Sequence, residues 1–283
     1  MRTAVAGLCI AAFAFPASAG AVGSSRVAAL QVALSAKGLY TGTIDGIAGP
    51  ATTAAVRRFQ KRTGLTPDGV FGPNTRRKLG RHGRPELGRR PLHLGAVGWD
   101  VARLQFLLAW HGFPSGAIDG TYGPHVVRAV RAYQRWAGLA PDGAAGPATI
   151  PSLLRTPVPR CPIALAWPLR GPLGDLFGPR GNRFHPGLDL PAPVGAPVAA
   201  GARGRVAYAG VLAGYGLLVV VAHRDGVRTF YGHLSRVDVR IGERVAAGAE
   251  VGRVGATGDA TGPHVHFEVR VRGAAVDPLS GLR

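Results

Sequence analysis

The apolar residues in the first half of this chain are spaced as in helices. Two stripes stand near the start: Val27, Leu30 and Leu34, then Ala55, Val56 and Phe59. Residues three or four apart lie on one helix face, so each stripe predicts a helix with one buried side. The stripes stop at Gly38 and Gly64, and glycine ends a helix readily because the residue after the last turn often needs a positive φ.

The spacing changes after Trp167, where short β-branched and apolar runs alternate with glycine-rich turns. The runs are Val194–Tyr208, Leu217–Ala222, Val227–Tyr231, Val237–Ile241, Val251–Val254 and Val265–Val271. Such runs predict strands, and Arg224-Asp225-Gly226 between two of them predicts a hairpin turn. Residues 167–280 are therefore expected to fold as an all-β domain with an antiparallel sheet.

The helical half is duplicated with an offset of 74 residues, the separation of Ile44 and Ile118. The matches include Leu30-Gln31 with Leu104-Gln105, Asp45-Gly46 with Asp119-Gly120, Gln60 with Gln134, Asp68-Gly69 with Asp142-Gly143, and Thr75 with Thr149. A long match without a gap indicates a duplicated structural unit. Each unit reads as helix, Asp-Gly turn, helix, Asp-Gly turn and short helix, which predicts a small all-α three-helix bundle made twice.

The pattern L-Q, G, D-G, G-P, A-V, F/Y-Q, G-L, D-G, G-P, T resembles the three-helix peptidoglycan-binding domain that is often attached to bacterial wall hydrolases. The two copies span 24–80 and 98–155, and the resemblance implies peptidoglycan as a partner. The second copy departs at Val126, where the first has Thr52, and at Ala144-Ala145, where the first has Val70-Phe71, so its affinity is expected to differ. The alternative is that both copies are inert spacers.

Four histidines of the β region stand out by their spacing: His185, His233, His264 and His266. Residues i and i+2 of a strand face the same side, so His264 and His266 project together. His185 has a carboxylate four residues on, at Asp189, and zinc accepts both nitrogen and oxygen ligands. Three protein ligands and one open position are typical of a catalytic zinc site, and no cysteine is nearby to close the fourth.

These histidines stand in motifs that resemble the lysostaphin and LytM-type zinc endopeptidases, which cut the peptide stems or cross-bridges of peptidoglycan. The motifs are Phe177-Gly178-Pro179-Arg180, His185-Pro186-Gly187-Leu188-Asp189, Gly195-Ala196-Pro197-Val198, Gly214-Tyr215-Gly216, Tyr231-Gly232-His233-Leu234-Ser235, Thr257-Gly258, and Thr261-Gly262-Pro263-His264-Val265-His266-Phe267-Glu268. The resemblance implies Zn²⁺ as cofactor, with His185, Asp189 and His266 as its ligands.

The same resemblance implies that His233 and His264 are catalytic residues lining the groove, with their separate proton-transfer roles left open. Glu268 falls on the strand face of His266, so either a hydrogen bond to an imidazole or a surface ion pair is possible there. The loop before His185 lacks the tyrosine that some members use to support the oxyanion, and Arg180 or Asn182 is the alternative. Of the other histidines, His223 is expected to be structural. Those of the helical half are expected to face solvent: His82, His93, His111 and His125.

The first residues have the order of a secretory signal: Arg2, an apolar stretch, then Ala17-Ser18-Ala19, after which cleavage is expected. Residues 1–19 would be the signal peptide, and no transmembrane segment is expected after its removal. Cys161 would then be the only thiol, either free or in an intermolecular disulfide. The sequence thus predicts a secreted or cell-envelope protein.

The net charge of +19 is concentrated in the front half. Its densest basic run is Arg76, Arg77, Lys78, Arg81, Arg84, Arg89 and Arg90, against the single Glu86. This run indicates an anionic partner such as an anionic wall polymer, and the alternative is a solvated basic linker over 81–97. No nucleic acid partner is expected, because no RNA-binding motif or zinc finger is present. A second, proline-rich linker is expected over 156–166.

The sequence therefore predicts an exported zinc endopeptidase held on the wall by two binding repeats. The alternative is a catalytically silent wall-binding or hydrolase-activating protein. Neither the bond that is cut nor the oligomeric state follows from the sequence.

Overall fold

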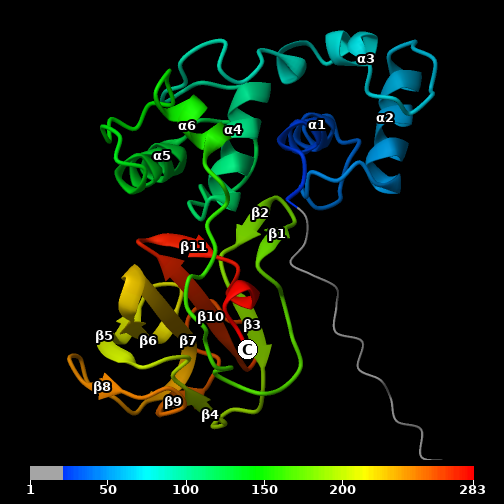
Figure 1. Cartoon of the computed structure of the whole chain (residues 1–283). Helices are drawn as coiled ribbons and strands as arrows, with labels where there is room; N and C mark the ends of the chain where they lie inside the picture. Colours follow the sequence, from blue (N-terminus) through cyan, green and yellow to red (C-terminus); the bar gives the residue numbers. More distant parts are fainter. Residues whose placement is uncertain (1–21) are drawn as a thin grey trace, which may run out of the picture.

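The computed structural model describes residues 22–283, a helical half followed by a sheet (Figure 1). The expected signal peptide lies outside the described residues. Among residues 22–283, no helix is both long and apolar enough to cross a bilayer. The predicted fold class is confirmed: two small three-helix units precede an antiparallel β domain.

Each repeat contains three helices. In the first they are α1 (Ser25–Ser35), α2 (Pro50–Arg62) and α3 (Pro73–Lys78), and in the second α4 (Trp99–Trp110), α5 (Pro124–Trp136) and α6 (Thr149–Arg155). A single 3₁₀ turn, η1 (Gly80–Gly83), follows α3. Proline begins α2, α3 and α5, where the first N–H of a helix has no partner to lose.

A buried glutamine holds each Asp-Gly turn of the repeats. Gln31 donates to the carboxylate of Asp45 at 2.6 Å, and its amide oxygen accepts from the backbone N–H of Gly46 at 2.9 Å. The same pair of bonds recurs at the other three turns, with Gln60, Gln105 and Gln134. The repeated Gln and Asp-Gly residues are therefore used by the fold itself.

The two repeats pack together through α1 and α4. The predicted stripe gave α1 one buried face, but every residue from Ala28 to Leu34 is buried. The reason is that Trp99, Ala102 and Phe106 of the second repeat join the core of the first, so α1 is covered on its other side as well.

The β domain begins with a separate two-stranded hairpin, β1 (Gly178–Arg180) and β2 (Arg183–His185). The remaining nine strands form one antiparallel sheet, in which β3 and β7 flank β10. They are β3 (Leu188–Pro191), β4 (Pro197–Ala199), β5 (Gly204–Leu212), β6 (Gly216–Ala222), β7 (Val227–Val237), β8 (Arg244–Val245), β9 (Glu250–Val254), β10 (His264–Val271) and β11 (Ala274–Val276). Val219, Phe267 and Val269 lie in the core.

Two predicted strands differ from the observed ones. The run Val194–Tyr208 is two strands, β4 and β5, separated by a bend. The run Val237–Ile241 is not a strand beyond Val237, because the chain leaves the sheet there for a turn that returns to β8. The hairpin turn predicted at Arg224-Asp225-Gly226 is confirmed, with Asp225 at a positive φ of 58°.

Neither segment that the sequence predicts as a linker is free of packing. In the basic segment 81–97, Leu92 is fully buried, and Glu86 forms ion pairs with Arg76 and Arg103. In the proline-rich segment 156–166, Ile163 and Leu165 belong to the core of the β domain. Both segments are therefore held against their neighbours.

Both repeats contact the β1–β2 hairpin. Equivalent residues of the two repeats, Ile44 and Ile118, donate their backbone N–H groups to the consecutive carbonyls of Gly181 and Asn182 at 2.8 and 2.7 Å. The ring of Trp110 packs edge-on against Phe184 of β2, with ring centroids 5.3 Å apart. The hairpin therefore lies between the helical half and the large sheet (Figure 1).

Candidate metal centre

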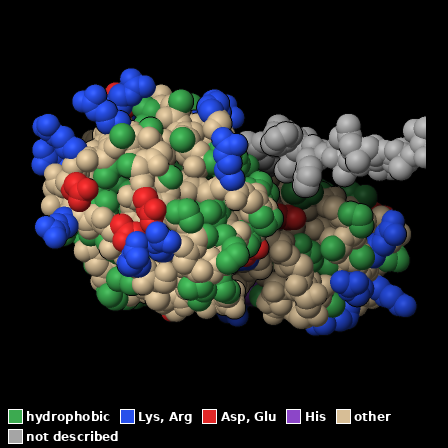
Figure 2. All heavy atoms as spheres, turned by 90° about the horizontal axis from the view of Figure 1, so that it is seen from below, with side chains coloured by type: hydrophobic (Ala, Val, Ile, Leu, Met, Phe, Trp, Pro, Cys, Tyr) green, Lys and Arg blue, Asp and Glu red, His purple; other side chains and the backbone are tan. Residues whose placement is uncertain are grey.

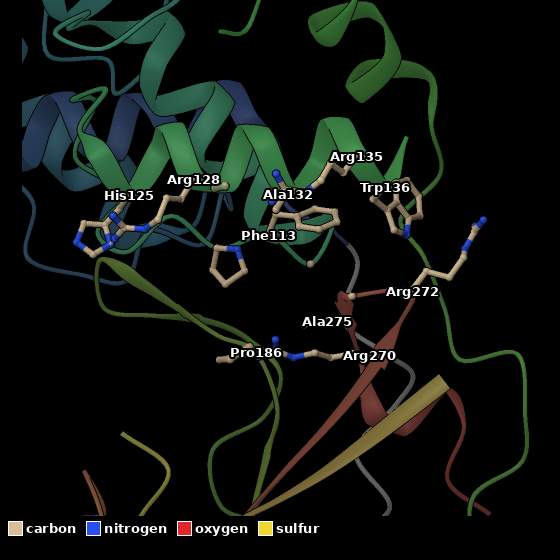
Figure 3. A pocket seen from close by; sticks show the side chains of 14 residues that line it. Phe113, His125, Arg128, Ala132, Arg135, Trp136, Pro186, Arg270, Arg272 and Ala275 are labelled. Atoms are coloured by element: carbon tan, nitrogen blue, oxygen red, sulfur yellow. Dashed lines mark hydrogen bonds between the residues drawn. The ribbon is translucent and has the colours of Figure 1, made fainter. Parts of the chain in front are cut away.

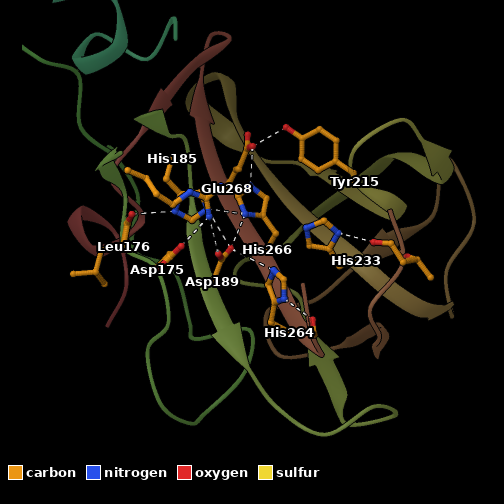
Figure 4. A network of polar contacts seen from close by, with 12 residues as sticks. Asp175, Leu176, His185, Asp189, Tyr215, His233, His264, His266 and Glu268 are labelled. Atoms are coloured by element: carbon orange, nitrogen blue, oxygen red, sulfur yellow. Dashed lines mark hydrogen bonds and ion pairs between the residues drawn. The ribbon is translucent and has the colours of Figure 1, made fainter. Parts of the chain in front are cut away.

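Three side chains from three strands meet beside the hairpin (Figure 4). His185 ends β2, while Asp189 and His266 are direct cross-strand partners in β3 and β10. Nε2 of His185 lies 3.0 Å from Nδ1 of His266 and 3.2 Å from Oδ1 of Asp189. Nδ1 of His266 lies 2.8 Å from the same oxygen. The three expected metal ligands are thus brought together.

The turn from β2 to β3 needs glycine at position 187. A Cβ on Gly187 would lie 2.6 Å from the carbonyl oxygen of Phe267 and 2.9 Å from Cε1 of His266. Contacts so short would push the turn away from β10, and His185 and Asp189 would move with it. In the His-Pro-Gly-Leu-Asp motif, the glycine is therefore required for steric reasons, while the histidine and the aspartate provide the ligand atoms.

The donor set fits a zinc ion. Zinc binds imidazole nitrogen and carboxylate oxygen at about 2.0–2.2 Å in tetrahedral geometry, which places neighbouring ligand atoms about 3.3 Å apart. The observed separations of 2.8–3.2 Å are close to that spacing. Within residues 22–283 this is the one group of three or more such side chains that could hold a metal. Three ligands leave one coordination position open, as catalytic zinc sites do.

Hydrogen bonds fix which ring nitrogen of each histidine faces the centre. Nδ1 of His185 lies 3.0 Å from the carbonyl oxygen of Leu176, and a carbonyl only accepts, so this nitrogen donates. Nε2 of His266 donates to Glu268 at 3.0 Å. The opposite nitrogens, Nε2 of His185 and Nδ1 of His266, therefore face Asp189 and are the atoms available to a metal ion.

Glu268 is fully buried and anchors this arrangement. Of the two alternatives at this position, the structure has the hydrogen bond to an imidazole. Glu268 also accepts from the hydroxyl of Tyr215 at 2.6 Å and from Nε of Arg270 at 2.7 Å. Burial alone would raise the pKa of Glu268, but the bond from His266 and the charge of Arg270 lower it to about 2.

The centre favours a positive charge. Burial alone would lower the pKa of His266, but its bonds to Asp189 and Glu268 raise that pKa to about 9. Burial would likewise raise the pKa of Asp189, yet the bonds from His185 and His266 hold it well below its usual range. A cation placed between these groups is therefore stabilised by two carboxylates.

His233 and His264 lie beside the three-residue cluster. Their rings are 4.7 Å apart, and Nε2 of His264 is 3.7 Å from Oδ1 of Asp189. Nδ1 of His233 donates to the carbonyl of Thr257 at 2.7 Å, and Nδ1 of His264 to that of Gly262 at 2.8 Å. Each ring therefore keeps a lone pair on Nε2. Burial lowers the pKa of His233, which holds it as a neutral base.

The backbone of His233 is strained. Its φ is 61°, in the left-handed region that few residues other than glycine adopt. Such strain is concentrated at functional sites, where the surroundings hold a residue in an unfavourable conformation. The neighbouring Gly232 pairs with His266 across β7 and β10, so this conformation sets where His233 sits relative to the cluster.

A cavity of about 390 Å³ opens over these five residues. Its lining also includes Asp175, Arg180, Tyr215, Asp259 and Thr261. Tyr215 belongs to a motif of the family resemblance, but Asp175 and Asp259 carry no sequence signal. Of the two candidates for oxyanion support, Arg180 lines the cavity and pairs with Asp175 at 2.8 Å. Asn182 lies instead in the hairpin turn against the repeats.

The remaining histidines serve the fold or face solvent. His223 is structural, as predicted, since its ring bridges Arg203 and Thr229. The prediction that His111 faces solvent is wrong: it is buried, and its ring joins the carbonyls of Leu107 and Thr156 at 2.7 and 2.9 Å. His93 and His125 are exposed and His82 is half-buried. Cys161 is a half-buried free thiol.

Two family models match the chain. "Peptidase family M23" matches residues 183–278, and "Putative peptidoglycan binding domain" matches residues 23–79 and 98–153. The first match contains the three clustered side chains and both additional histidines, and the second covers both helical repeats.

Curated relatives are similar over the β domain. The DD-carboxypeptidase/endopeptidase Mpg of Neisseria meningitidis is 45% identical over 98 residues, which cover 35% of this chain and 23% of the relative. The murein hydrolase activator EnvC of Escherichia coli is 40% identical over 118 residues, covering 41% and 28%. This chain spans about a quarter of the length of these relatives.

Among solved structures, the catalytic domain of lysostaphin from Staphylococcus simulans is 34% identical, with 38% of this chain and 89% of that chain covered and a TM-score of 0.36. The resemblance carried by the sequence motifs is confirmed by the family matches, over both the helical repeats and the β domain. The chain thus contains a domain of peptidase family M23 preceded by two peptidoglycan-binding domains.

Proposed function

We propose that this chain is a zinc-dependent endopeptidase that hydrolyses peptide bonds of peptidoglycan stems or cross-bridges. The observation that carries the proposal is the convergence of His185, Asp189 and His266 with two further histidines in one cavity. Held by these three residues, a zinc ion would supply Lewis acidity, which would make water more acidic and polarise a carbonyl.

The roles of His233 and His264 follow from their ring nitrogens. Each Nδ1 is occupied by a backbone carbonyl, so Nε2 is the atom that can accept a proton from water or pass one to a leaving amine. Arg180 at the cavity edge, or His233 after it has accepted a proton, can stabilise a developing oxyanion. Positioned groups of this kind contribute about 10²–10⁴-fold each to a rate.

The helical repeats would bind the wall and raise the concentration of substrate near the cavity. The basic run before α4 contributes Arg76, Arg77, Arg84 and Arg89 to a groove of about 780 Å³, where an anionic wall polymer could bind. A location in the cell envelope and export by residues 1–19 belong to the same proposal.

The second candidate is a hydrolase activator without catalysis. It is favoured by one observation, the similarity to proteins named murein hydrolase activators. Such a protein would bind the wall but release no fragments by itself. A complete set of three ligand atoms around one point supports the enzyme instead.

The test is digestion of purified cell-wall sacculi, with mass analysis of the released fragments. We expect cleavage that a chelator abolishes and zinc restores, and we expect His264→Ala to lower the rate by at least a hundredfold. The matched control is His93→Ala, which removes an exposed histidine of the helical half and should leave the rate unchanged. Cleavage that survives chelation, or no cleavage at all, would reject the enzyme.

A further inference from the structure

A second cavity, of about 770 Å³, lies between the helical half and the sheet. One wall is α5, with Arg128, Arg135 and Trp136, and the other is formed by Pro186 and the turn between β10 and β11, with Arg272 (Figure 3). We refer to it as the interdomain groove. Pro186 also lines the metal cavity, so the two cavities are adjacent.

The interdomain groove is fixed by docking contacts. The N–H of Ala275 donates to the carbonyl of Gly112 at 3.1 Å, which joins β11 to the end of α4. A Cβ on Gly112 would fall on the backbone of Ala275, so only glycine permits this approach. The groove is therefore a defined feature whose walls are bonded to each other.

Four arginines line the groove, and among the described residues only Arg270 has an acidic partner, Glu268. Arg128, Arg135 and Arg272 line it without forming an ion pair to any residue of 22–283, and no Asp or Glu of that range is in the lining. The guanidinium of Arg128 bonds only to the ring of His125, at 2.7 Å. In the basic groove near α3, by contrast, Glu86 pairs with Arg76 and Arg103. Figure 2, which shows the molecule from below, has Lys and Arg side chains scattered over the surface with fewer Asp and Glu among them.

Arg272 occupies a position that disfavours arginine. It has a φ of 51° in the two-residue turn from β10 to β11, where glycine or asparagine is the usual choice. Such strained positions are concentrated at functional sites, and this one fixes where the Arg272 side chain leaves the turn. The guanidinium of Arg272 lies over the ring of Trp136, 5.5 Å from its centre, so it is held at the groove.

We propose that the interdomain groove binds a carboxylate-bearing segment of the peptide substrate, with Arg128, Arg135 and Arg272 as the anion-binding residues. The guanidinium fork matches a carboxylate in a bidentate arrangement. Phe113, Ala132 and Trp136 give the groove an apolar side suited to the rest of a peptide. The proposal rests on the proposed function for the identity of this ligand as substrate.

A peptide suits the groove better than a long anionic polymer does. Besides its arginines it has the apolar surface of Phe113 and Trp136, which the side chains of a peptide can cover and a polyanion would leave unused. It also adjoins the metal cavity through Pro186, so one extended peptide can occupy both. The groove would then select substrates with a free carboxylate some residues from the bond that is cut.

The test is an NMR titration of the metal-free full chain with N-acetylated trialanine and with its C-terminal amide. Without metal no hydrolysis interferes. The wild type is expected to bind the acid at least fivefold more tightly than the amide. The double variant Arg128→Ala/Arg135→Ala is expected to bind both equally. The matched control is Arg131→Ala on the same helix, whose guanidinium faces the carbonyl of Asp142 and does not line the groove.

Arg272→Gly separates binding from stability. Glycine relieves the positive φ, so the variant should unfold at the same or a higher temperature than the wild type. It should nevertheless lose most of the preference for the acid. If it unfolds at a clearly lower temperature and keeps the preference, Arg272 serves only to hold the two domains together, and its assignment is overturned.

Equal affinity of the wild type for acid and amide would overturn the proposal, as would an equal loss in Arg131→Ala. Tighter binding of poly(glycerol phosphate), with the same dependence on Arg128 and Arg135, would reject the peptide as occupant. The digestion of sacculi is a separate assay. If the sacculi are not cleaved but the wild type still binds the acid more tightly than the amide, the enzyme is rejected. If the sacculi are cleaved but acid and amide bind equally, only the proposed ligand of the interdomain groove is rejected.

Discussion

The two helical repeats share their internal bonds but differ on the surface that meets the β domain. Gln31 and Gln105 hold equivalent turns in the same way. At the ends of α1 and α4, however, the first repeat has Ala36 where the second has Trp110. Trp110 packs against Phe177 and Phe184 of the β domain. The repeated glutamines therefore hold the bundle in both copies, whereas the aromatic contact with the β domain belongs to the second copy alone.

Equivalent glycines show the same contrast. Gly38 and Gly112 both have positive φ, 68° and 86°, and both end a helix. A Cβ on Gly38 would meet nothing within 4 Å, whereas one on Gly112 would collide with Ala275. The second repeat therefore packs against the hairpin that contains His185. It is docked on the β domain rather than joined to it only by a linker.

The largest effect is expected from Gly112→Ala. Its methyl group collides with backbone that has no room to move, so the docking contact should open, at a cost of about 3 kcal/mol or more in the free energy of unfolding. Gly38→Ala meets the same backbone penalty without the collision and should cost about 1 kcal/mol. Denaturant unfolding of both variants measures the difference. Equal losses would mean that the second repeat is not docked.

Trp110 is only partly buried, so Trp110→Ala should cost about 2–3 kcal/mol in the free energy of unfolding, and it should also weaken zinc binding. The loss of its ring frees Phe184, the neighbour of His185, so one ligand becomes less well positioned. Phe59→Ala, a buried aromatic of the first repeat, is the control: it should destabilise the bundle but leave zinc affinity unchanged. Chelator competition at a temperature where both variants are folded measures this. An unchanged zinc affinity in Trp110→Ala would show that the docking of the second repeat does not help to position the zinc ligands.

Gln31→Ala and Gln105→Ala should destabilise the protein to a similar degree, by about 1–3 kcal/mol each. Each removes the partner of a buried Asp-Gly turn, and the two networks are equivalent. Thermal unfolding of the two variants side by side tests the equivalence. A loss confined to one repeat would show that the shared residues do not play the same part in both.

Zinc affinity should rise about tenfold per pH unit between pH 7 and pH 9. In the metal-free protein the raised pKa of His266, about 9, keeps its ring protonated over this range. Zinc and the proton compete for the ring, so binding releases about one proton below this pKa and none above it. Titrations in buffers of different ionisation enthalpy count that proton. A pH-independent affinity from 7 to 9 would show that His266 is neutral before binding.

The bundles, the sheet and the residue types at the candidate site could be predicted from sequence because their signals are local. Gln31 and Asp45 lie in one repeat, and His264 and His266 share a strand. His111 could not be predicted, since its partner Thr156 reaches it only through tertiary packing. In the same way, the end of the strand at Val237 depends on where the chain turns back to β8 rather than on β propensity.

The docking surfaces had no sequence signal that could be interpreted alone. Arg272 and Trp136 are far apart in the chain and meet only because β11 packs on α4. The ring nitrogens that face the metal centre likewise depend on carbonyls, such as those of Leu176 and Thr257, whose positions only the fold determines. Residue types indicated which side chains could bind a metal, while the direction in which their ring nitrogens point required the structure.

Zinc binding by His185, Asp189 and His266 is tested most simply by the zinc stoichiometry and affinity of the full chain, measured by chelator competition at pH 7.5. We predict one tightly bound zinc ion in the wild type and a loss of affinity of at least a hundredfold in Asp189→Ala, because one of only three proposed protein ligands is removed. Asp259→Ala, which removes another carboxylate of the same cavity, should bind zinc nearly as tightly as the wild type. No zinc in the wild type, or equal affinity in Asp189→Ala, would contradict this prediction.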